Sequence, residues 1–403
     1  MIRAAIFLLT FASSCTASAR TYSIEEAIEI AKKQSFERAA ILAQKDTLEA
    51  KSTQAMALSQ PSFALGIGDI AGHPGSENSN LRTYQVSQSF GFPGKAKASA
   101  NVYENEAKGA AEEVKAKDLE ITRQVRNTFF DLWLLQQRLS LNRGKQSSFG
   151  KILEVAKRRF VKSTTTEVEY LALEAERTRI ENERADVEAD EKRARTTLNL
   201  LLGLPLEADT GTNAPPLSVK SKLDQEKLRA QFRNNNPTLR SLRWKREAAE
   251  SRVSEAKSAY LPDFRITTGT NSYNAYAGSL EVSVPLWFWW NERSGVKAAV
   301  GAQAAFEADT AAKERTLSSL FEENLISLEN EEFKIKNYQA MLVPNSRHAF
   351  EIALKNYRFG KIEFATLTNS AENLTNTELE LDTLRASFEK TKGEIEELVG
   401  GTL

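Results

Sequence analysis

Residues 278–291 read GSLEVSVPLWFWWN and alternate apolar with polar side chains. Leu280, Val282 and Val284 would share one face of an extended chain, because successive side chains of a strand point to opposite faces. The run is much shorter than the roughly 20 residues of a membrane-spanning helix, whereas a tilted barrel strand crosses a bilayer in about 10. Trp and Tyr collect at membrane interfaces. The pattern therefore predicts a membrane strand that ends in an aromatic girdle formed by Trp287, Phe288, Trp289 and Trp290.

The first 19 residues have the layout of a secretory signal. A positive residue is followed by an apolar run and by the small-residue site Ala17-Ser18-Ala19, so we expect Arg20 to open the mature chain. Cys15 is the only cysteine in the sequence, which excludes a disulfide framework. Residues 12–15 resemble a lipoprotein cleavage box, and Cys15 is therefore also a candidate lipidation site.

Charge and hydropathy exclude several classes of protein. The chain has 54 basic and 54 acidic residues, so it has no net field that would draw it to nucleic acid. After residue 19 no run of 18 apolar residues occurs, and the sequence therefore predicts no ordinary transmembrane helix.

Helical and extended periods alternate along the mature chain. Ser23-Ile24-Glu25-Glu26 has the form of a capping box, which predicts a helix that runs to about Leu58 with a break near residues 33–35. From Pro61 to Pro93 the apolar period changes to two residues, with a turn-rich polar loop in the middle. We therefore expect a long-looped β-hairpin here.

Two long helices should follow this hairpin. Residues 94–204 contain no proline, and apolar residues within 114–139 repeat at coiled-coil spacing, which predicts a helix of roughly 65 residues that ends near Phe160. A second helix should span residues 167–202. Its middle is charged nearly all round, so we expect water on two sides of it. Apolar residues recur there only at every seventh position, at Ile180, Val187 and Ala194.

The same order of segments then occurs again. Residues 60–63 align with 261–264 at an offset of 201, and residues 85–87 align with 281–283 at an offset of 196. A repeat of this length is a duplicated half rather than a solenoid unit. The second copy opens at Asn236-Pro237, where Asn is a helix cap and Pro the first helical residue. We expect this helix and helix 167–202 to lie end to end beside the first long helix.

Each copy supplies two strands, and four strands cannot close a barrel. In lipid, an open sheet edge leaves unpaired N–H and C=O groups that cost several kcal/mol each. We therefore expect the chain to oligomerise, and three copies would give twelve strands, which is a plausible barrel size.

This arrangement resembles the TolC-type outer membrane efflux proteins over nearly the whole mature chain. The first hairpin, with Gly68-Asp69-Ile70, is most similar to the heavy-metal branch of that family. No single motif is specific, but their order and duplication are. The matching segments are Ser23-Ile24-Glu25-Glu26-Ala27-Ile28, Phe92-Pro93-Gly94-Lys95, Asn236-Pro237-Thr238-Leu239 and Tyr357-Arg358-Phe359-Gly360, followed by Leu367 and Ala371.

The resemblance implies a mainly α fold with a small membrane β part. Duplicated long antiparallel helical hairpins would form a periplasmic α-barrel, and four strands per chain would contribute to a trimeric 12-stranded β-barrel in the outer membrane of a Gram-negative bacterium. The expected segments are a signal peptide (1–19), N-terminal periplasmic helices (20–60), β-hairpin 1 (61–93), long helical hairpin 1 (94–202), a linker or equatorial segment (203–222), the helices of the second repeat (223–261), β-hairpin 2 (262–290), and long helical hairpin 2 with the C-terminus (291–403).

The resemblance also implies that the turns of the two helical hairpins meet a periplasmic adaptor, which links them to an inner-membrane pump. Ser163 stands where the family has a glycine. The residues that correspond to these docking tips are Arg159, Lys162, Ser163, Arg358, Gly360 and Lys361.

A pore constriction is the second site that the family implies. Thr366 and Asn369 stand where some members carry aspartates that narrow the pore. Rings of like charge are a usual means of ion selection, and nearby glutamates could replace those aspartates. The candidate constriction residues are Glu167, Glu169, Glu363, Thr366 and Asn369.

No feature of the sequence indicates an enzyme. His73 and His348 are far apart and have no Cys or His partners, and no nucleophile motif or phosphate-binding loop occurs. We expect no catalytic residue, no metal site and no cofactor. The expected function is the outer-membrane channel of a tripartite efflux system, which passively conducts small molecules or metal ions and has outer-membrane lipid, adaptor and pump as partners. Two alternatives stay open: the duct of a type I protein secretion system, and a periplasmic coiled-coil scaffold without a pore.

Overall fold

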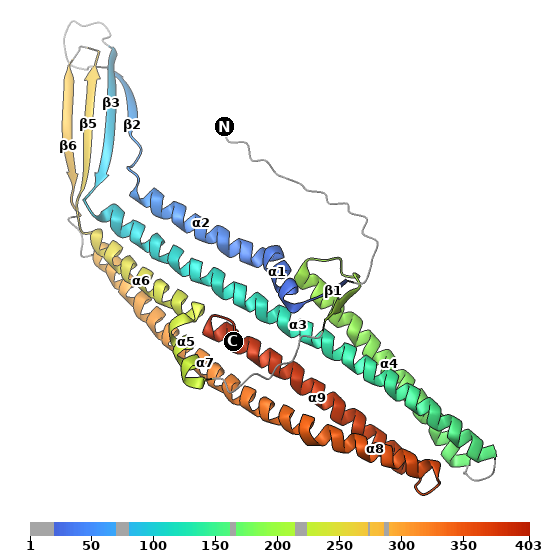
Figure 1. Cartoon of the computed structure of the whole chain (residues 1–403). Coiled ribbons are helices and arrows are strands. Elements are labelled where there is room, and N and C mark those ends of the chain that lie inside the picture. Colours follow the sequence, from blue (N-terminus) through green and yellow to red (C-terminus); the bar gives the residue numbers. More distant parts are fainter. Residues whose placement is uncertain (1–19, 70–79, 162–166, 214–223, 273–274, 286–289) are drawn as a thin grey trace.

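The computed structural model describes residues 20–69, 80–161, 167–213, 224–272, 275–285 and 290–403. It is an elongated, mainly helical molecule with a four-stranded sheet at one end (Figure 1). The fold class expected from the sequence is therefore confirmed for the single chain.

Both expected hairpins form, and they join into one sheet. The strands are β2 (Ser62–Asp69), β3 (Asn80–Gly91), β5 (Asp263–Asn271) and β6 (Tyr276–Ser283), all antiparallel in the order β2-β3-β5-β6. β6 ends sooner than its alternating pattern suggested, so the expectation that Val284 belongs to the strand is wrong. Pro285 follows it and has no N–H for a strand ladder.

The first copy supplies four helices. They are α1 (Ile24–Gln34), α2 (Phe36–Met56), α3 (Lys95–Val161) and α4 (Glu167–Leu202). The capping box forms at the start of α1, where Ser23 and Glu26 exchange backbone-to-side-chain hydrogen bonds of 3.2 Å each. The break before α2 arises because Ser35 is itself an N-cap and accepts from the backbone of Arg38.

The second copy repeats this order with one interruption. Its helices are α5 (Gln225–Asn235), α6 (Pro237–Ser258), α7 (Glu292–Asn337), α8 (Val343–Arg358) and α9 (Phe364–Val399). The long helix expected here is divided by the π-helical turn η1 (Tyr338–Leu342). Pro344 lacks an N–H at the start of α8, and a local π turn accommodates the missing bond. α3 contains no proline and runs for 67 residues.

The short helices do not stack as the sequence suggested. α4 ends against α1, where the Gln34 side chain packs on Gly203: a Cβ added to this glycine would lie 3.2 Å from Gln34 Cβ. α9 ends against α6, where Asn236 Nδ2 donates to the carbonyl of Leu398 at 2.7 Å. In each copy, the last helix therefore adjoins the short helices of the same copy: α4 adjoins α1, and α9 adjoins α6. The expected end-to-end stacking of α4 with α6 is wrong. α3 packs against both columns, α2 with α4 and α6 with α9 (Figure 1).

The segment after α4 is not only a linker. Residues Thr210–Thr212 form β4, which pairs in parallel with β1 (Arg20–Tyr22). Asn199 holds this crossing: its buried amide donates to the carbonyls of Leu206 and Ala208 and accepts from Thr210. Sequence periodicity gave no signal for this pairing, because three residues are too few for a pattern.

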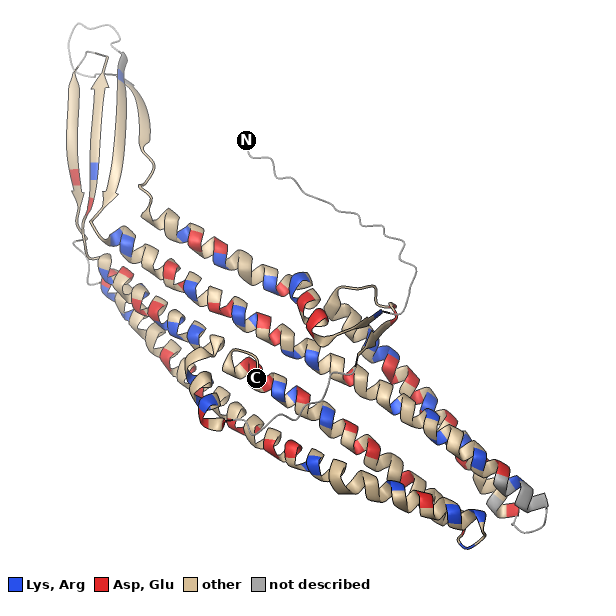
Figure 2. Ribbon diagram, in the orientation of Figure 1, with Lys and Arg blue, Asp and Glu red and all other residues tan. Residues whose placement is uncertain are grey.

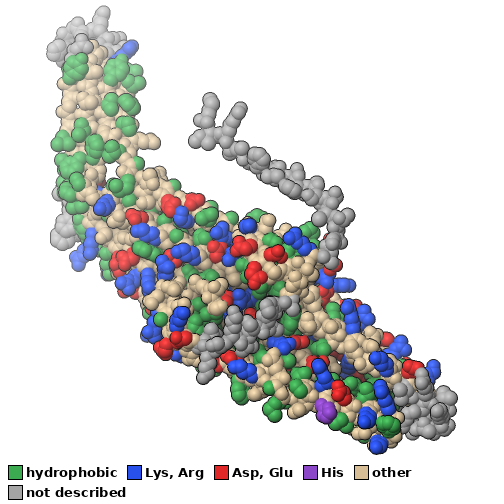
Figure 3. Space-filling view, in the orientation of Figure 1, with side chains coloured by type: hydrophobic (Ala, Val, Ile, Leu, Met, Phe, Trp, Pro, Cys, Tyr) green, Lys and Arg blue, Asp and Glu red, His purple; other side chains and the backbone are tan. Residues whose placement is uncertain are grey.

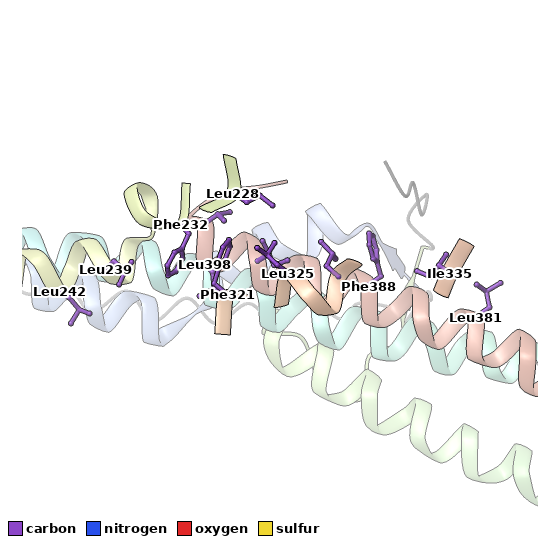
Figure 4. Packing of buried hydrophobic residues seen from close by; sticks show 13 residues of the cluster. Leu228, Phe232, Leu239, Leu242, Phe321, Leu325, Ile335, Leu381, Phe388 and Leu398 are labelled. Atoms are coloured by element: carbon purple, nitrogen blue, oxygen red, sulfur yellow. The ribbon is translucent and has the colours of Figure 1, made fainter. Parts of the chain in front are cut away.

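Apolar residues are buried in narrow seams between the helices. Ile121, Val125 and Leu132 of the expected coiled-coil seam are buried against α1 and α4. Ile180 and Val187 are buried in the otherwise charged α4, as expected. A larger cluster joins α5, α6, α7 and α9, and the rings of Phe232 and Phe321 stack there at 4.7 Å (Figure 4).

A buried ion cluster joins the two halves of the chain where α3 meets α9. Arg126 Nη2 lies 2.7 Å from a carboxylate oxygen of Glu396, and Arg126 Nη1 lies 3.9 Å from a carboxylate oxygen of Glu389. All three side chains are largely buried. Burial raises the pKa of the Glu389 carboxyl, while Lys392 and Arg126 oppose that rise. The Arg126 side chain crosses α9 at Gly393, where an added Cβ would lie 2.7 Å from Arg126 Cδ.

This close approach predicts opposite effects of two glycine-to-alanine changes. Gly393→Ala should lower the free energy of unfolding by about 1–3 kcal/mol, because Arg126 would have to leave its buried carboxylates. Gly144→Ala is the matched control: its Cβ meets no atom within 4 Å, and it should raise stability by about 0.5–1 kcal/mol through helix propensity. Thermal unfolding followed by far-UV circular dichroism measures both. A Gly393→Ala protein as stable as the parent would contradict the argument.

Candidate functional site

The four-stranded sheet is apolar on one face. Residues paired across antiparallel strands share a face, so Phe63 and Leu65 of β2 lie beside Val86 and Tyr84 of β3, and Ile67 lies beside Arg82. The three β2 side chains are 77–79% exposed. The same face continues across the sheet with Phe264 and Ile266 of β5 and Leu280 and Val282 of β6. Hydrophobic side chains accordingly cover the strands in Figure 3.

The opposite face is small and polar. Ser62 pairs with Ser87, and their hydroxyl oxygens are 2.6 Å apart. The described side chains of this face include Ala64, Thr83, Gln85, Thr267, Ala277 and Ser279, with charged residues only near the helices. The sheet thus has one apolar and one polar face, the pattern that is typical of strands that separate lipid from water.

Both outer strands of the sheet lack a partner within the chain. β2 pairs only with β3, and β6 only with β5, in the part that the structure describes. Such edges present unpaired N–H and C=O groups. Within the described ranges, no helix has both the length and the apolar character of a membrane span.

The aromatic girdle is described at one position. Trp290 directly precedes the α7 N-cap and is 79% exposed. Trp287, Phe288 and Trp289 lie outside the described residues, as does Cys15.

The turn between α8 and α9 has the exposure that a docking tip requires. Arg358, Phe359, Gly360 and Lys361 are all exposed. Gly360 has φ +71°, a left-handed conformation that favours glycine. The amides of Gly360 and Lys361 donate to the carbonyls of Tyr357 and Asn356 at 2.9 Å and so end α8.

The other candidate tip is described only in part. Lys162 and Ser163 lie outside the described residues. Arg159 belongs to the last turn of α3, but its side chain is not among those described, and the same holds for Glu169 at the start of α4.

An aromatic cluster holds the two helical hairpins together close to the tips. Tyr357 and Phe364 flank the α8–α9 turn and are buried, and their rings lie 6.2 Å apart. Phe149 of α3 contacts Phe364 edge to face at 6.1 Å, and Leu173 of α4 completes the contact. Sequence reasoning treated Tyr357 only as part of a motif and missed this role.

The candidate constriction residues that are described are exposed. Glu167 opens α4, Glu363 is the α9 N-cap, and Thr366 and Asn369 lie on the first turns of α9. No group of three or more His, Cys, Asp or Glu that could hold a metal ion occurs among the described residues. His348 is exposed, and His73 lies outside the described ranges.

An ion network joins the two helical hairpins farther from the tips than the aromatic cluster, and the sequence alone did not predict it. Arg179 of α4 bonds Glu176 at 2.7 Å and also reaches Glu372 of α9. These carboxylates, Glu176 first, raise the pKa of Arg179. Lys145 of α3 lies 3.4 Å from Glu183 in the same network. The charged residues of α4 predicted only a solvated helix face, because the sequence of α4 does not reveal that α9 packs beside it.

Comparison with known proteins agrees with this geometry. Residues 228–401 match the family model described as outer membrane efflux protein. The chain is 22% identical over 363 residues to the cobalt-zinc-cadmium resistance protein CzcC of Cupriavidus metallidurans, which covers 87% of this chain and 84% of that protein.

Solved structures share the fold. The outer membrane protein VceC of Vibrio cholerae is similar with a TM-score of 0.80 and 17% identity, over 94% of this chain and 96% of that one. The outer membrane channel CmeC of Campylobacter jejuni is similar with a TM-score of 0.81 and 13% identity, over 94% and 85%.

The two faces of the sheet predict different effects of the same substitution at adjacent positions. Leu280→Arg places a charge on the apolar face and should oppose membrane insertion by about 2–4 kcal/mol if the site is near the bilayer centre. Ser279→Arg places it on the polar face and should have little effect. The measurement is the fraction of refolded protein that floats with phospholipid vesicles. Equal flotation of the two variants would contradict the assignment of the faces.

Proposed function

Because residues 228–401 match the family model of the outer membrane efflux proteins, we propose that the chain is the outer-membrane channel of a tripartite efflux system. It is an outer-membrane protein with a periplasmic helical part. The observation that carries the proposal is the one-sided sheet with two unpartnered edges at the end of a helical body.

Closure by three copies satisfies both edges. Strand directions alternate across β2, β3, β5 and β6, so β6 of one copy meets β2 of the next in antiparallel orientation. Three copies close twelve strands into a barrel, an even number as antiparallel closure requires.

The helices offer a matching pair of edges. α2 packs on α3, α3 on α6, and α6 on α7, so α2 and α7 border the helical row just as the adjoining strands β2 and β6 border the sheet (Figure 1). α2 has no buried residue, and Phe36 is 90% exposed. On α7, Ile326 and Phe333 are 68% and 65% exposed. Contact between α7 and the border of the next copy that α2, α1 and α4 form covers these apolar residues, which supports a continuous helical tube.

The tube conducts passively, and an inner-membrane pump supplies the energy through a periplasmic adaptor. The likeness to CzcC supports divalent transition-metal ions as the substrate class. The polar inner face of the sheet keeps the path wet.

The duct and its substrate class are tested separately. In planar bilayers, the purified trimer should give ion conductance; its absence would favour a scaffold without a pore. A strain that lacks this protein should become sensitive to cobalt, zinc and cadmium salts, and a plasmid copy should restore growth. Sensitivity to dyes and antibiotics with unchanged metal tolerance would contradict the metal assignment and leave the duct intact.

Adaptor docking is proposed at the exposed cations of the α8–α9 turn. Arg358→Glu with Lys361→Glu should weaken cross-linking to the adaptor by about tenfold or more, because both charges face solvent at the tip and meet the partner directly. Arg293→Glu, an exposed charge at the opposite end of the helical part, is the matched control and should leave docking unchanged. Unaltered cross-linking and metal resistance in the tip variant would reject this docking site.

A further inference from the structure

Charged side chains gather at one level of the polar face of the sheet. Asp263, Arg265 and Glu281 occupy the ends of β5 and β6 that adjoin the helices, and Lys95 opens α3 beside them. Among the strand side chains that the structure describes, the rest of this face carries only Ser, Thr, Gln, Asn, Ala and Gly. Figure 2 shows the contrast with the helices, where both charges are spread along the whole length. We call Lys95, Asp263, Arg265 and Glu281 the collar.

The collar consists of two ion pairs and is neutral. Arg265 and Glu281 are direct cross-strand partners, with Nη1 and Oε2 3.5 Å apart, and Arg265 Nε donates to Ser89 Oγ at 3.2 Å. Lys95 Nζ lies 2.9 Å from Asp263 Oδ1. The Arg265 and Glu281 side chains remain 53% and 60% exposed, so their charges face open space rather than protein.

Stability alone does not account for the Arg265–Glu281 pair. An exposed pair of this kind contributes about 0–1 kcal/mol. A polar pair such as Ser62 with Ser87 occupies the same kind of cross-strand position without any charge. A charged pair differs from a neutral pair here in the electrostatic potential of the space that it faces. Each charge alone creates a potential there, and its partner cancels it.

We propose that the Arg265–Glu281 pair keeps the mouth of the strand barrel unselective between cations and anions, by cancelling charge at the level where strands meet helices. The inference rests on the proposed function, since it requires the polar face to line a closed barrel. Three copies then present three positive and three negative groups in one ring. Small inorganic ions of either sign, and metal ions among them, pass a ring that has no net charge.

The size of the barrel makes the effect measurable. Twelve strands about 4.8 Å apart and tilted by about 40° enclose a radius of about 12 Å. The Debye length is about 30 Å at 10 mM salt and about 3 Å at 1 M. A ring of three uncompensated charges therefore acts across the whole lumen at low salt, where it changes the local concentration of a monovalent ion roughly threefold, and is screened at high salt.

The experiment uses two variants that break the same pair. Arg265→Gln leaves three glutamates and should make the trimer cation-selective; Glu281→Gln leaves three arginines and should make it anion-selective. Reversal potentials in planar bilayers under a salt gradient near 10 mM should therefore shift in opposite directions, and both shifts should vanish near 1 M. The permeability ratio should change by roughly tenfold, because cations and anions each change by roughly threefold in opposite senses. The exchange of both residues, Arg265→Glu with Glu281→Arg, should restore the parent value.

Arg82→Gln is the control, since it removes a positive charge from the apolar face and should leave selectivity unchanged. Shifts of equal sign in the two single variants would show that the pair acts by holding the strands, which overturns the proposal, and unchanged reversal potentials would overturn it as well. Absence of conductance in the parent protein would instead reject the proposed duct, so the two failures are distinct.

Discussion

Unpaired backbone groups at the edges of the small sheet constrain this molecule more than any other feature. An N–H or C=O without a partner is costly in lipid, and the apolar face of the sheet belongs in lipid. β2 and β6 have no second neighbour in the described chain. The proposed assembly follows from this constraint: identical copies stand side by side, and their helical parts line up at the same spacing as their strands.

The helical body meets that demand with very little core. Single rows of apolar residues, such as Ile180 and Val187 in α4, are buried while the residues around them are mostly charged. In the proposed tube, a wall one helix thick with water on both sides allows no larger core. Buried polar contacts add to the stabilisation that this small apolar core provides. Asn199 and Asn236 fasten the ends of the two repeats, and Arg126 joins α3 to α9 through the carboxylates of Glu389 and Glu396.

Charge is distributed differently in the two parts. On the helices, Lys, Arg, Asp and Glu are spread along the whole length (Figure 2). Many of them pair with a neighbour one turn away, as Arg177 does with Glu181 and Arg184 with Glu188. On the described strands, charge on the polar face is confined to the collar. Local pairs on a helix need only a helix to form, whereas the collar needs two strands in one register. The collar is thus a product of strand pairing, and in the proposed barrel its neutrality affects the electrostatic potential of the lumen.

The sequence by itself determined which segments are helix and which are strand. Prolines, the capping residues Ser23 and Asn236, and the change of apolar period are local signals, and the elements begin and end close to where they indicate. The apolar face of the sheet was predictable from alternation for the same reason. Tertiary structure alone decided that β3 pairs with β5, that α4 stacks on α1 rather than on α6, and that Arg179 meets Glu372. It also decided that Tyr357 and Phe364 pack beneath the tip and that Arg265 faces Glu281. Those contacts join residues far apart in the chain, and periodicity reports which face of an element is buried but not which partner buries it.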